Sequence, residues 1–247
     1  MRIFVINLER SVERRALMRD QLDAIGLNYE FLAAVDGRAD EHLHFPNYKD
    51  EFCLQAWRRV MAAGEAATIA SHFKLWKLCV ELNEPIIVLE DDAGLSSRFV
   101  EALSVVEERL MHVSFVRLSA LTTPAFREER LELPADWKLV RFLSGPMGTQ
   151  CYAVAPDAAG RFVRHAERWV VPIDIYMDSF WKHGVPCLGL MPFPVAAREE
   201  IGSTVWTDEA SRAVLYRKDV RAPKRFAARK LCDLRRQLKS VEYLLLR

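Results

Sequence analysis

The sequence predicts a single α/β domain with a mostly parallel central sheet, followed by a basic helical extension. A β-α-β pattern opens the chain over residues 3–35, and such a unit implies a parallel strand pair joined by a right-handed crossover. Residues 86–89 form an uninterrupted apolar run, which is typical of a central strand covered on both faces. Helical and strand patterns alternate up to residue 191 without a repeat or a low-complexity linker, so one domain is expected.

The expected elements follow in chain order. A strand over residues 3–8 precedes a helix that Ser11 begins and Gly26 ends, because apolar side chains between them recur at helical spacing. A second strand over 28–35 ends at an Asp-Gly turn. After it we expect helices over 52–63, 66–82, 98–110, 156–169 and 173–183, and loops over 38–51 and 120–137. Further strands are expected over 85–90, 113–118, 137–143, 149–155 and 186–191. The strands over 137–143 and 149–155 are expected to be antiparallel or mixed.

Composition limits the class of protein. The 247 residues are 51% hydrophobic, which is enough to bury a core, and the net charge of +1 points to no partner by itself. The five cysteines show no CxxC spacing, which argues against a disulfide framework or a zinc site and favours a reducing compartment. Charges crowd residues 9–15 and no apolar run approaches 18 residues, so neither a signal peptide nor a membrane span is expected. These features predict a cytoplasmic protein.

The basic charge is concentrated at the end of the chain. Residues 217–247 carry eleven Lys or Arg against three Asp or Glu, which leaves 24 against 31 in residues 1–216. We expect residues 1–206 to form the domain and 207–247 a basic amphipathic tail, because apolar residues recur at helical spacing over 221–247. This helix either lies on an anionic membrane surface or packs on the acidic body. Nucleic acid is not expected, since stacking aromatics do not alternate with the basic residues.

Three acids, Glu90, Asp91 and Asp92, directly follow the apolar strand. Adjacent carboxylates repel one another, so a positive partner is expected beside them. Ligands of open α/β sheets collect at the carboxyl ends of the strands, and carboxylate oxygens suit a hard divalent cation. Alternatively, Asp91 or Asp92 caps a helix that begins near Gly94 or Ser96. The triplet alone does not decide between a metal site and a helix cap.

Two further segments place polar side chains near the acidic strand. INLERSVERR (6–15) carries Asn7, Arg10 and two further arginines just past the first strand, where arginines can pair with phosphates. GEAATIASHFKLW (64–76) carries Glu65 and His72 on the helix that precedes the acidic strand. An ordinary surface helix or a structural histidine explains each of these side chains equally well when it is taken alone.

Two later segments add a bend and a pair of acids. MGTQCYAV (147–154) contains a Gly-Thr bend at Gly148 and Thr149, where the backbone can approach a ligand closely. PIDIYMD (172–178) carries Asp174 and Asp178, which share a helix face because they are four residues apart. Two acids on one helix face are also typical of a solvated surface.

Together, in this order, these segments resemble glycosyltransferase family 25, the family of bacterial lipopolysaccharide or lipooligosaccharide galactosyltransferases and their collagen galactosyltransferase relatives. The resemblance includes AVDG (34–37) and PIIVLEDD (85–92) and extends over about residues 3–195. The family often has Gly-Cys where this chain has Ala67 and Thr68, a departure that affects helix packing more than chemistry. Residues 120–137 and the tail match no part of the family pattern.

The resemblance implies a GT-A-like, Rossmann-type domain that takes a UDP-sugar and uses the acidic triplet in place of a DxD motif. It implies that Mn²⁺ or Mg²⁺ binds Asp92 and Glu90, and that Glu90 serves the ribose or a metal-bound water. As an inverting family, it implies a general base, for which Asp174 is the first choice, Asp178 the second and His72 the third. The implied nucleotide pocket consists of Asn7, Arg10, Glu65, Glu90, Asp91, Gly148 and Thr149, with Asp91 the acid of the triplet expected to be mainly structural.

The expected reaction transfers galactose from UDP-galactose to a sugar hydroxyl of lipopolysaccharide or lipooligosaccharide. Such an acceptor implies a protein that lies at the inner face of the bacterial inner membrane. A UDP-glucose-dependent glucosyltransferase and a catalytically inactive family member that acts as a binding or scaffold protein stay open as alternatives.

Overall fold

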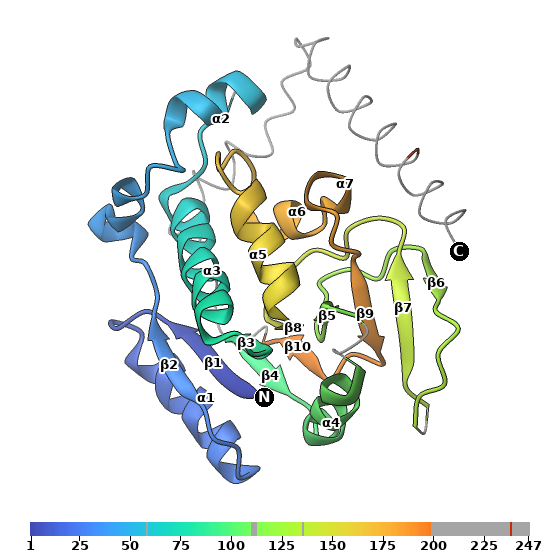
Figure 1. Cartoon of the computed structure of the whole chain (residues 1–247). Coiled ribbons are helices and arrows are strands. Elements are labelled where there is room, and N and C mark those ends of the chain that lie inside the picture. The colour runs from blue at the N-terminus through green and yellow to red at the C-terminus, as the bar shows by residue number, and fades with distance from the viewer. Residues whose placement is uncertain (58, 110–112, 135, 199–237, 239–247) are drawn as a thin grey trace.

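The computed structural model describes residues 1–57, 59–109, 113–134, 136–198 and 238, and an eight-stranded sheet lies at its centre (Figure 1). The pairs β1–β2, β1–β3 and β5–β9 are parallel, whereas β7 and β8 run antiparallel to both of their neighbours. Because these two are the reversed strands among the eight, six share one direction, and the predicted fold class is confirmed. The sheet order is β2 (Glu30–Ala33), β1 (Arg2–Asn7), β3 (Ile86–Glu90), β8 (Cys151–Val154), β5 (Phe115–Arg117), β9 (Leu188–Met191), β7 (Lys138–Phe142) and β6 (Phe126–Glu128).

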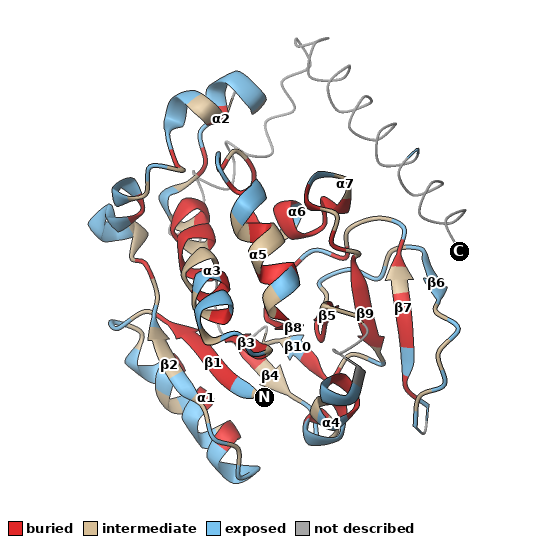
Figure 2. Ribbon diagram, in the orientation of Figure 1, coloured by how far each residue is buried: buried red, intermediate tan, exposed pale blue. Residues whose placement is uncertain are grey.

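Helices cover both faces of the sheet. On one face α1 (Val12–Ala24) and α4 (Phe99–Arg109) pack in a cluster with Val5 and Leu89 of the strands. On the other face, α3 (Ala63–Leu82), α5 (Pro156–His165) and α6 (Ile173–Met177) pack in a cluster with Phe4 and Val88. Successive strand residues therefore point to opposite cores, as the period of two requires. Figure 2 shows the buried strands between helices whose outer surfaces are exposed.

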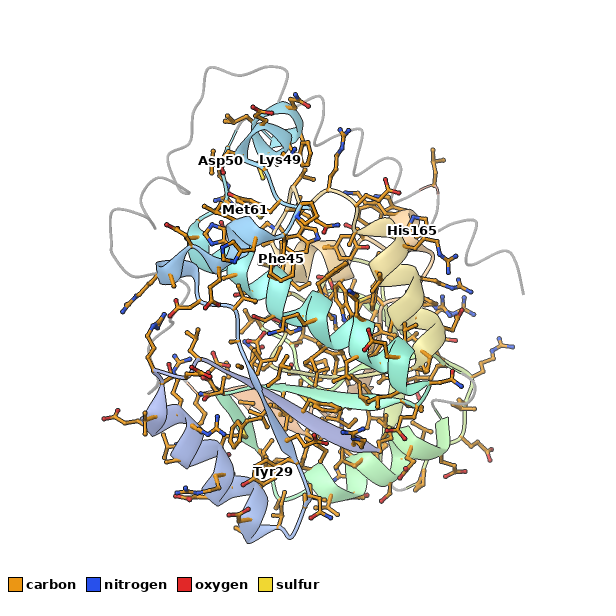
Figure 3. The ribbon with its side chains drawn as sticks, turned by 60° about the vertical axis from the view of Figure 1, so that its left-hand side comes forward. Tyr29, Phe45, Lys49, Asp50, Met61 and His165 are labelled. Atoms are coloured by element: carbon orange, nitrogen blue, oxygen red, sulfur yellow. The ribbon has the colours of Figure 1, made fainter. Side chains whose placement is uncertain are left out.

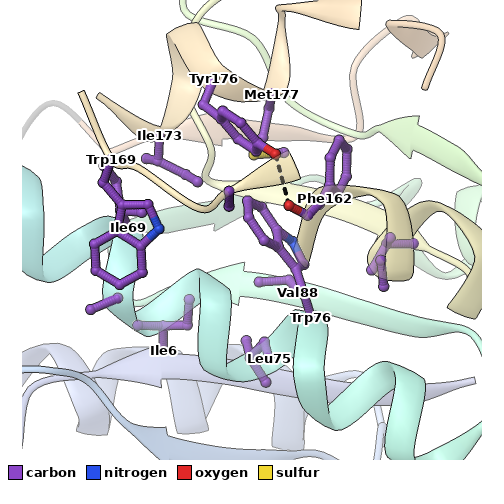
Figure 4. Packing of buried hydrophobic residues seen from close by; sticks show 14 of the residues in the cluster. Ile6, Ile69, Leu75, Trp76, Val88, Phe162, Trp169, Ile173, Tyr176 and Met177 are labelled. Atoms are coloured by element: carbon purple, nitrogen blue, oxygen red, sulfur yellow. Dashed lines mark hydrogen bonds between the residues drawn. The ribbon is translucent and has the colours of Figure 1, made fainter. Parts of the chain in front are cut away.

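Aromatic side chains dominate the core beneath α3 and α5. The ring centroid of Trp76 lies 4.8 Å from that of Phe162 and 5.9 Å from that of Tyr176. The Tyr176 hydroxyl donates to the Phe162 carbonyl at 2.7 Å (Figure 4). Such rings bury large apolar areas, and the hydroxyl keeps a partner inside the core. This packing fixes α3, α5 and α6 relative to one another.

Residues 38–51, expected to be loop, contain two 3-10 helices (Gly37–Ala39 and Glu41–His44) and the start of α2 (Asp50–Trp57). In Figure 3, Phe45, Lys49, Asp50 and Met61 lie toward one end of the molecule, and Tyr29 lies toward the opposite end. Since Tyr29 directly precedes β2, these segments flank the carboxyl end of that strand.

The helix predicted over 173–183 is broken into α6 and α7 (Phe180–His183). The break follows Met177, where the Ser179 hydroxyl bonds back to the Ile175 carbonyl at 2.6 Å. Serine hydroxyls compete in this way with regular helix bonding. The break leaves Asp178 at the end of α6 rather than inside a continuous helix.

The alternative in which an acid of the triplet caps a helix near residues 94–96 is wrong. Ala93–Leu95 form a short strand, β4, which pairs antiparallel with β10 (Val195–Ala197). The backbone N–H of Leu95 donates to the Gln21 side chain at 3.0 Å, and α4 begins only at Phe99. Partners distant in sequence hold this segment extended.

No helix among the described residues is long and apolar enough to cross a membrane. The four described cysteines are free and buried. The predicted domain boundary at 206 and the basic tail over 207–247 lie outside the described residues, except for Leu238.

Candidate active site

The acidic triplet lies where the connections of the sheet change direction. β1 lies between β2 and β3, and the helices that make the two connections, α1 and α3, cover opposite faces. Ligands of open α/β sheets bind outside the carboxyl ends of the strands at such a switch point. Asn7 ends β1 and Glu90 ends β3, and the register pairs Ile6 with Glu90. The predicted residues of the first and third strands therefore meet at one edge.

Asp91 joins the two strand ends. Its Oδ2 accepts from the Asn7 side chain at 2.7 Å, and its Oδ1 accepts from the Arg14 guanidinium at 2.8 Å. Burial raises the pKa of Asp91, and the contacts of Asn7 and Arg14 only partly offset this effect. Both carboxylate oxygens are engaged within the protein, so this geometry suits a structural role for Asp91.

Glu90 is contacted by one imidazole and one hydroxyl group. His72 Nε2 lies 3.0 Å from Glu90 Oε1, and the Thr149 hydroxyl donates to the same oxygen. Burial alone would raise the pKa of Glu90, but the hydrogen bonds from His72 and Thr149 outweigh it and leave this pKa below its ordinary value. Glu90 is therefore an oriented acceptor at the site edge.

Asp92 differs from its two neighbours. Its Oδ1 is buried, and no described residue donates a hydrogen bond to it. Burial, followed by the charges of Glu90 and Asp91, raises the pKa of Asp92 to about 7. A buried carboxylate oxygen without a donor, beside two further acids, is a position that a cation would stabilise.

The donors present fit one kind of metal site. Among the described residues, no group of three or more His, Cys, Asp or Glu is arranged to hold a metal ion by itself. Mg²⁺ in nucleotide sites takes one or two carboxylates and completes its shell with phosphate oxygens and water, and Mn²⁺ accepts the same oxygen ligands. Asp92 and Glu90 therefore fit a metal that arrives with a diphosphate, and they do not form a closed protein cage.

A buried ion pair shapes the loop that precedes β8. Arg117 of β5 is fully buried and donates to the Gly148 carbonyl and, at 2.5 Å, to Asp178. The other oxygen of Asp178 accepts from the Met147 N–H at 3.2 Å. A Cβ at Gly145 would lie 2.0 Å from that carboxylate, so only glycine fits there. Asp178, the second choice for the base, is thus engaged in holding residues 145–148.

Asp174 also contacts this loop, through the backbone of Gly148. It stands in the first turn of α6, where its carboxylate accepts from the Ile175 N–H at 2.8 Å. Burial raises its pKa, the charge of Asp178 adds to this rise, and hydrogen bonds from the backbone of Ile175 and Gly148 oppose it. Since Gly148 precedes the Thr149 that contacts Glu90, the loop brings the triplet and Asp174 to one edge of the sheet.

Arg10 and Glu65 have partners of their own near this edge. The guanidinium of Arg10 pairs with Asp36 at 3.0 Å. Both oxygens of Glu65 accept from Arg59 at 3.0 Å, and Oε2 also accepts from the Ala62 N–H at 2.8 Å, which completes the start of α3. The structure does not join either side chain to the triplet through a hydrogen bond among the described residues, and their part in a nucleotide pocket stays a prediction.

Four residues of the site were not predicted from the sequence. Arg117 signals itself as a charge inside an apolar strand pattern, which requires a buried partner. Tyr152 and Trp76 reach His72 only through packing of α3 on β8, and no sequence signal marks them. Gln150 follows the predicted Gly-Thr bend, and its buried Oε1 has no donor among the described residues.

This arrangement, a mostly parallel sheet between two helical layers with polar side chains around a switch point, defines a Rossmann-like α/β domain. Comparison with known families goes further. The model for glycosyltransferase family 25, described as an LPS biosynthesis protein, matches residues 1–177. The chain therefore belongs to glycosyltransferase family 25, as the sequence motifs predict.

Curated relatives match a shorter part of the chain. A glycosyltransferase 25 family member of Aedes aegypti is 37% identical over 113 residues, 42% of this chain and 18% of its own length. Procollagen galactosyltransferase 2 of Mus musculus is 30% identical over 115 residues, 43% and 18% of the two chains. A probable inactive glycosyltransferase 25 family member 3 of Rattus norvegicus is 31% identical over 118 residues, 44% and 19%. The matched segment thus covers less than a fifth of each relative.

Proposed function

We propose that this protein is a metal-dependent, inverting glycosyltransferase that moves galactose from UDP-galactose to a sugar hydroxyl of lipopolysaccharide or lipooligosaccharide. The observation that carries the proposal is the buried Asp92 Oδ1, which no described residue contacts through a hydrogen bond, beside Glu90 at the switch point. Family membership supports glycosyl transfer. The names of the mouse relative and of the family model support galactose as the donor sugar and lipopolysaccharide as the acceptor.

In this proposal Asp92 and Glu90 would hold the divalent cation that neutralises the diphosphate of the donor. A bound Mn²⁺ or Mg²⁺ would supply Lewis-acid stabilisation of the charge on the departing diphosphate. The acceptor oxygen attacks the anomeric carbon from the face opposite the diphosphate, and the bond from that carbon to the phosphate oxygen breaks. UDP leaves with the bonding electrons, and the acceptor proton passes to a general base.

Asp174 is the residue best placed to take that proton. Its raised pKa makes its carboxylate a stronger base than an ordinary aspartate. Asp178 is committed to Arg117 and the Met147 N–H, and the fully buried His72 directs its Nε2 to Glu90. These contacts suit Asp178 and His72 to positioning rather than to proton transfer from the acceptor.

Binding measurements test the metal site first. Isothermal titration with UDP, UDP-galactose and UDP-glucose, each with and without Mn²⁺, is expected to show Mn²⁺-dependent binding. Asp92→Asn should weaken that binding at least about tenfold, while Asp157→Asn, a change at an exposed aspartate on α5, should leave it unchanged. Absence of Mn²⁺-dependent binding by all three nucleotides would overturn the proposal.

Turnover separates the remaining alternatives. Release of UDP in the presence of purified lipooligosaccharide identifies an active transferase, and the ratio of kcat/KM for UDP-galactose and UDP-glucose identifies the donor sugar. Relatives named inactive exist in this family, so binding without transfer would assign this chain to a binding role.

A further inference from the structure

A chain of buried hydrogen bonds runs from α3 through β8 to Glu90. Trp76 Nε1 lies 3.1 Å from the Tyr152 hydroxyl, and that hydroxyl lies 2.8 Å from His72 Nδ1. The opposite nitrogen of the imidazole, Nε2, lies 3.0 Å from Glu90 Oε1. Trp76, Tyr152 and His72 are all fully buried. The chain therefore ends at Glu90, the member that reaches the site edge.

The direction of these bonds follows from chemistry. The indole N–H of Trp76 can only donate, so the Tyr152 oxygen accepts from it. At the other end of the chain the Glu90 carboxylate can only accept, so a neutral His72 donates to it from Nε2 and accepts the Tyr152 hydrogen at Nδ1. An imidazole that accepts at Nδ1 carries its hydrogen on Nε2, and this hydrogen points at Glu90. The donor-only indole and the acceptor-only carboxylate thereby set the direction of each bond between them, and the Tyr152 hydroxyl is the group that satisfies Nδ1 of His72.

We propose that Trp76 and Tyr152 are positioning residues that lock His72 as the Nε2–H tautomer and thereby orient Glu90 for the nucleotide sugar. His72 and Thr149 both donate to Oε1 of Glu90, which directs Oε2 to the donor substrate or its metal. What Glu90 binds rests on the proposed function, whereas the tautomer lock rests on the hydrogen bonds alone. Second partners of this kind orient the groups that touch a ligand, and their loss typically weakens metal affinity roughly 10–100-fold.

The decisive variant is Tyr152→Phe, which removes the hydroxyl and keeps the ring. Without that hydroxyl, Nδ1 of His72 loses its donor, and the ring is no longer held with its Nε2–H against Glu90. The matched control is Tyr176→Phe, because Tyr176 is buried in the same core and its hydroxyl bonds to the Phe162 carbonyl rather than to His72. Both variants lose one buried hydroxyl, and only the first interrupts the chain.

Two measurements read the result. The carbon-13 shift of the His72 ring reports the tautomer directly, and calorimetry with UDP and Mn²⁺ reports the Kd. For Tyr152→Phe we expect loss of the Nε2–H signature and a Kd that rises roughly 10–100-fold, and for Tyr176→Phe no change in either. An unchanged tautomer, or a Kd within about twofold of that of Tyr176→Phe, would overturn the proposal.

A double-mutant comparison in the His72→Gln background distinguishes loss of the hydrogen bond from a folding defect. His72→Gln replaces the imidazole with an amide that donates without a choice of tautomer. In this background Tyr152→Phe should cost less than about a threefold change in Kd, and a full additive loss would contradict the lock. If the wild type shows the Nε2–H signature but binds no nucleotide, the lock stands and the proposed function fails, so the two results are distinguishable.

Discussion

Asp92→Asn should make the metal-free protein more stable while weakening metal-dependent nucleotide binding. The substitution keeps the size of the side chain and removes one of three adjacent charges. In the folded protein that charge is opposed by burial and by Glu90 and Asp91, which together raise the pKa of Asp92 to about 7. The wild-type chain therefore carries an electrostatic cost at this position that the variant lacks.

The size and sign of the effect follow from this pKa. A rise from 3.8 to about 7 costs the ionised form about 4 kcal/mol, at 1.36 kcal/mol per pH unit. Between these two pH values the folded chain holds a proton that the unfolded chain has released, so stability falls as pH rises through the window. At pH 8 Asp92→Asn should gain up to about 4 kcal/mol of unfolding free energy, and near pH 4 the gain should vanish.

Urea unfolding in EDTA at pH 4, 6 and 8 measures this difference, with Asp157→Asn as the control for loss of an exposed charge. Addition of Mn²⁺ and UDP should then stabilise the wild type more than Asp92→Asn, because the variant binds them more weakly. An Asp92→Asn chain that is no more stable than the wild type at pH 8 would refute the electrostatic reasoning. In that case the ionised Asp92 carboxylate would not destabilise the folded protein.

Three further predictions concern other residues. Asp178→Asn should lower the free energy of unfolding by about 3–5 kcal/mol in urea titrations, because it leaves Arg117 buried without its anion. Asp174→Asn should leave this free energy unchanged and lower kcat at least about 100-fold, and the reverse pattern would exchange the roles of the two residues. Burial lowers the pKa of His183 to about 3, so below about pH 6.5 only the unfolded chain gains a proton at this residue. The free energy of unfolding of the wild type should therefore fall by about 1.4 kcal/mol per pH unit toward pH 3, and His183→Gln should reduce this slope in urea titrations at pH 7 and pH 5. Because residues 221–247 are rich in Lys and Arg, we propose that they bind anionic membranes. Their deletion should abolish cosedimentation with vesicles of anionic lipid and leave transfer to a soluble acceptor unchanged, and retained cosedimentation would exclude this role.

The sequence carries enough information to predict the sheet and the edge at which the site forms. The apolar run that ends at Glu90 and the β-α-β opening require a parallel core, and their shared edge follows from strand direction. This reasoning predicts that Asn7 and the triplet lie together, as the hydrogen bond between Asn7 and Asp91 confirms. Local pattern was sufficient because Asn7 ends β1, Glu90 ends β3 and the other two acids follow Glu90 directly.

The sequence does not show which charged side chains pair with one another or which short strands pair in the sheet. Arg14 is one of the arginines for which both phosphate pairing and an ordinary surface position were open, and in the structure it lies in α1 and pairs with Asp91. Nothing local distinguishes Asp174 from Asp178, since their roles depend on Arg117, which lies on a strand about sixty residues earlier. β4 and β10 are three residues each and about a hundred residues apart, so neither carries a signal for the other.

The reversed strand β8 has a consequence for the order in which the chain is made. It completes the sheet between β3 and β5, although it is synthesised after both of them. Until residues 151–154 emerge, one side of β3 lacks its partner, and its residues Ile86–Leu89 are fully buried in the finished protein. An apolar strand with a free edge is a template for aggregation. A chain interrupted before residue 151 should therefore aggregate instead of folding, and the Glu90 contact with Thr149 depends on the same late part of the chain.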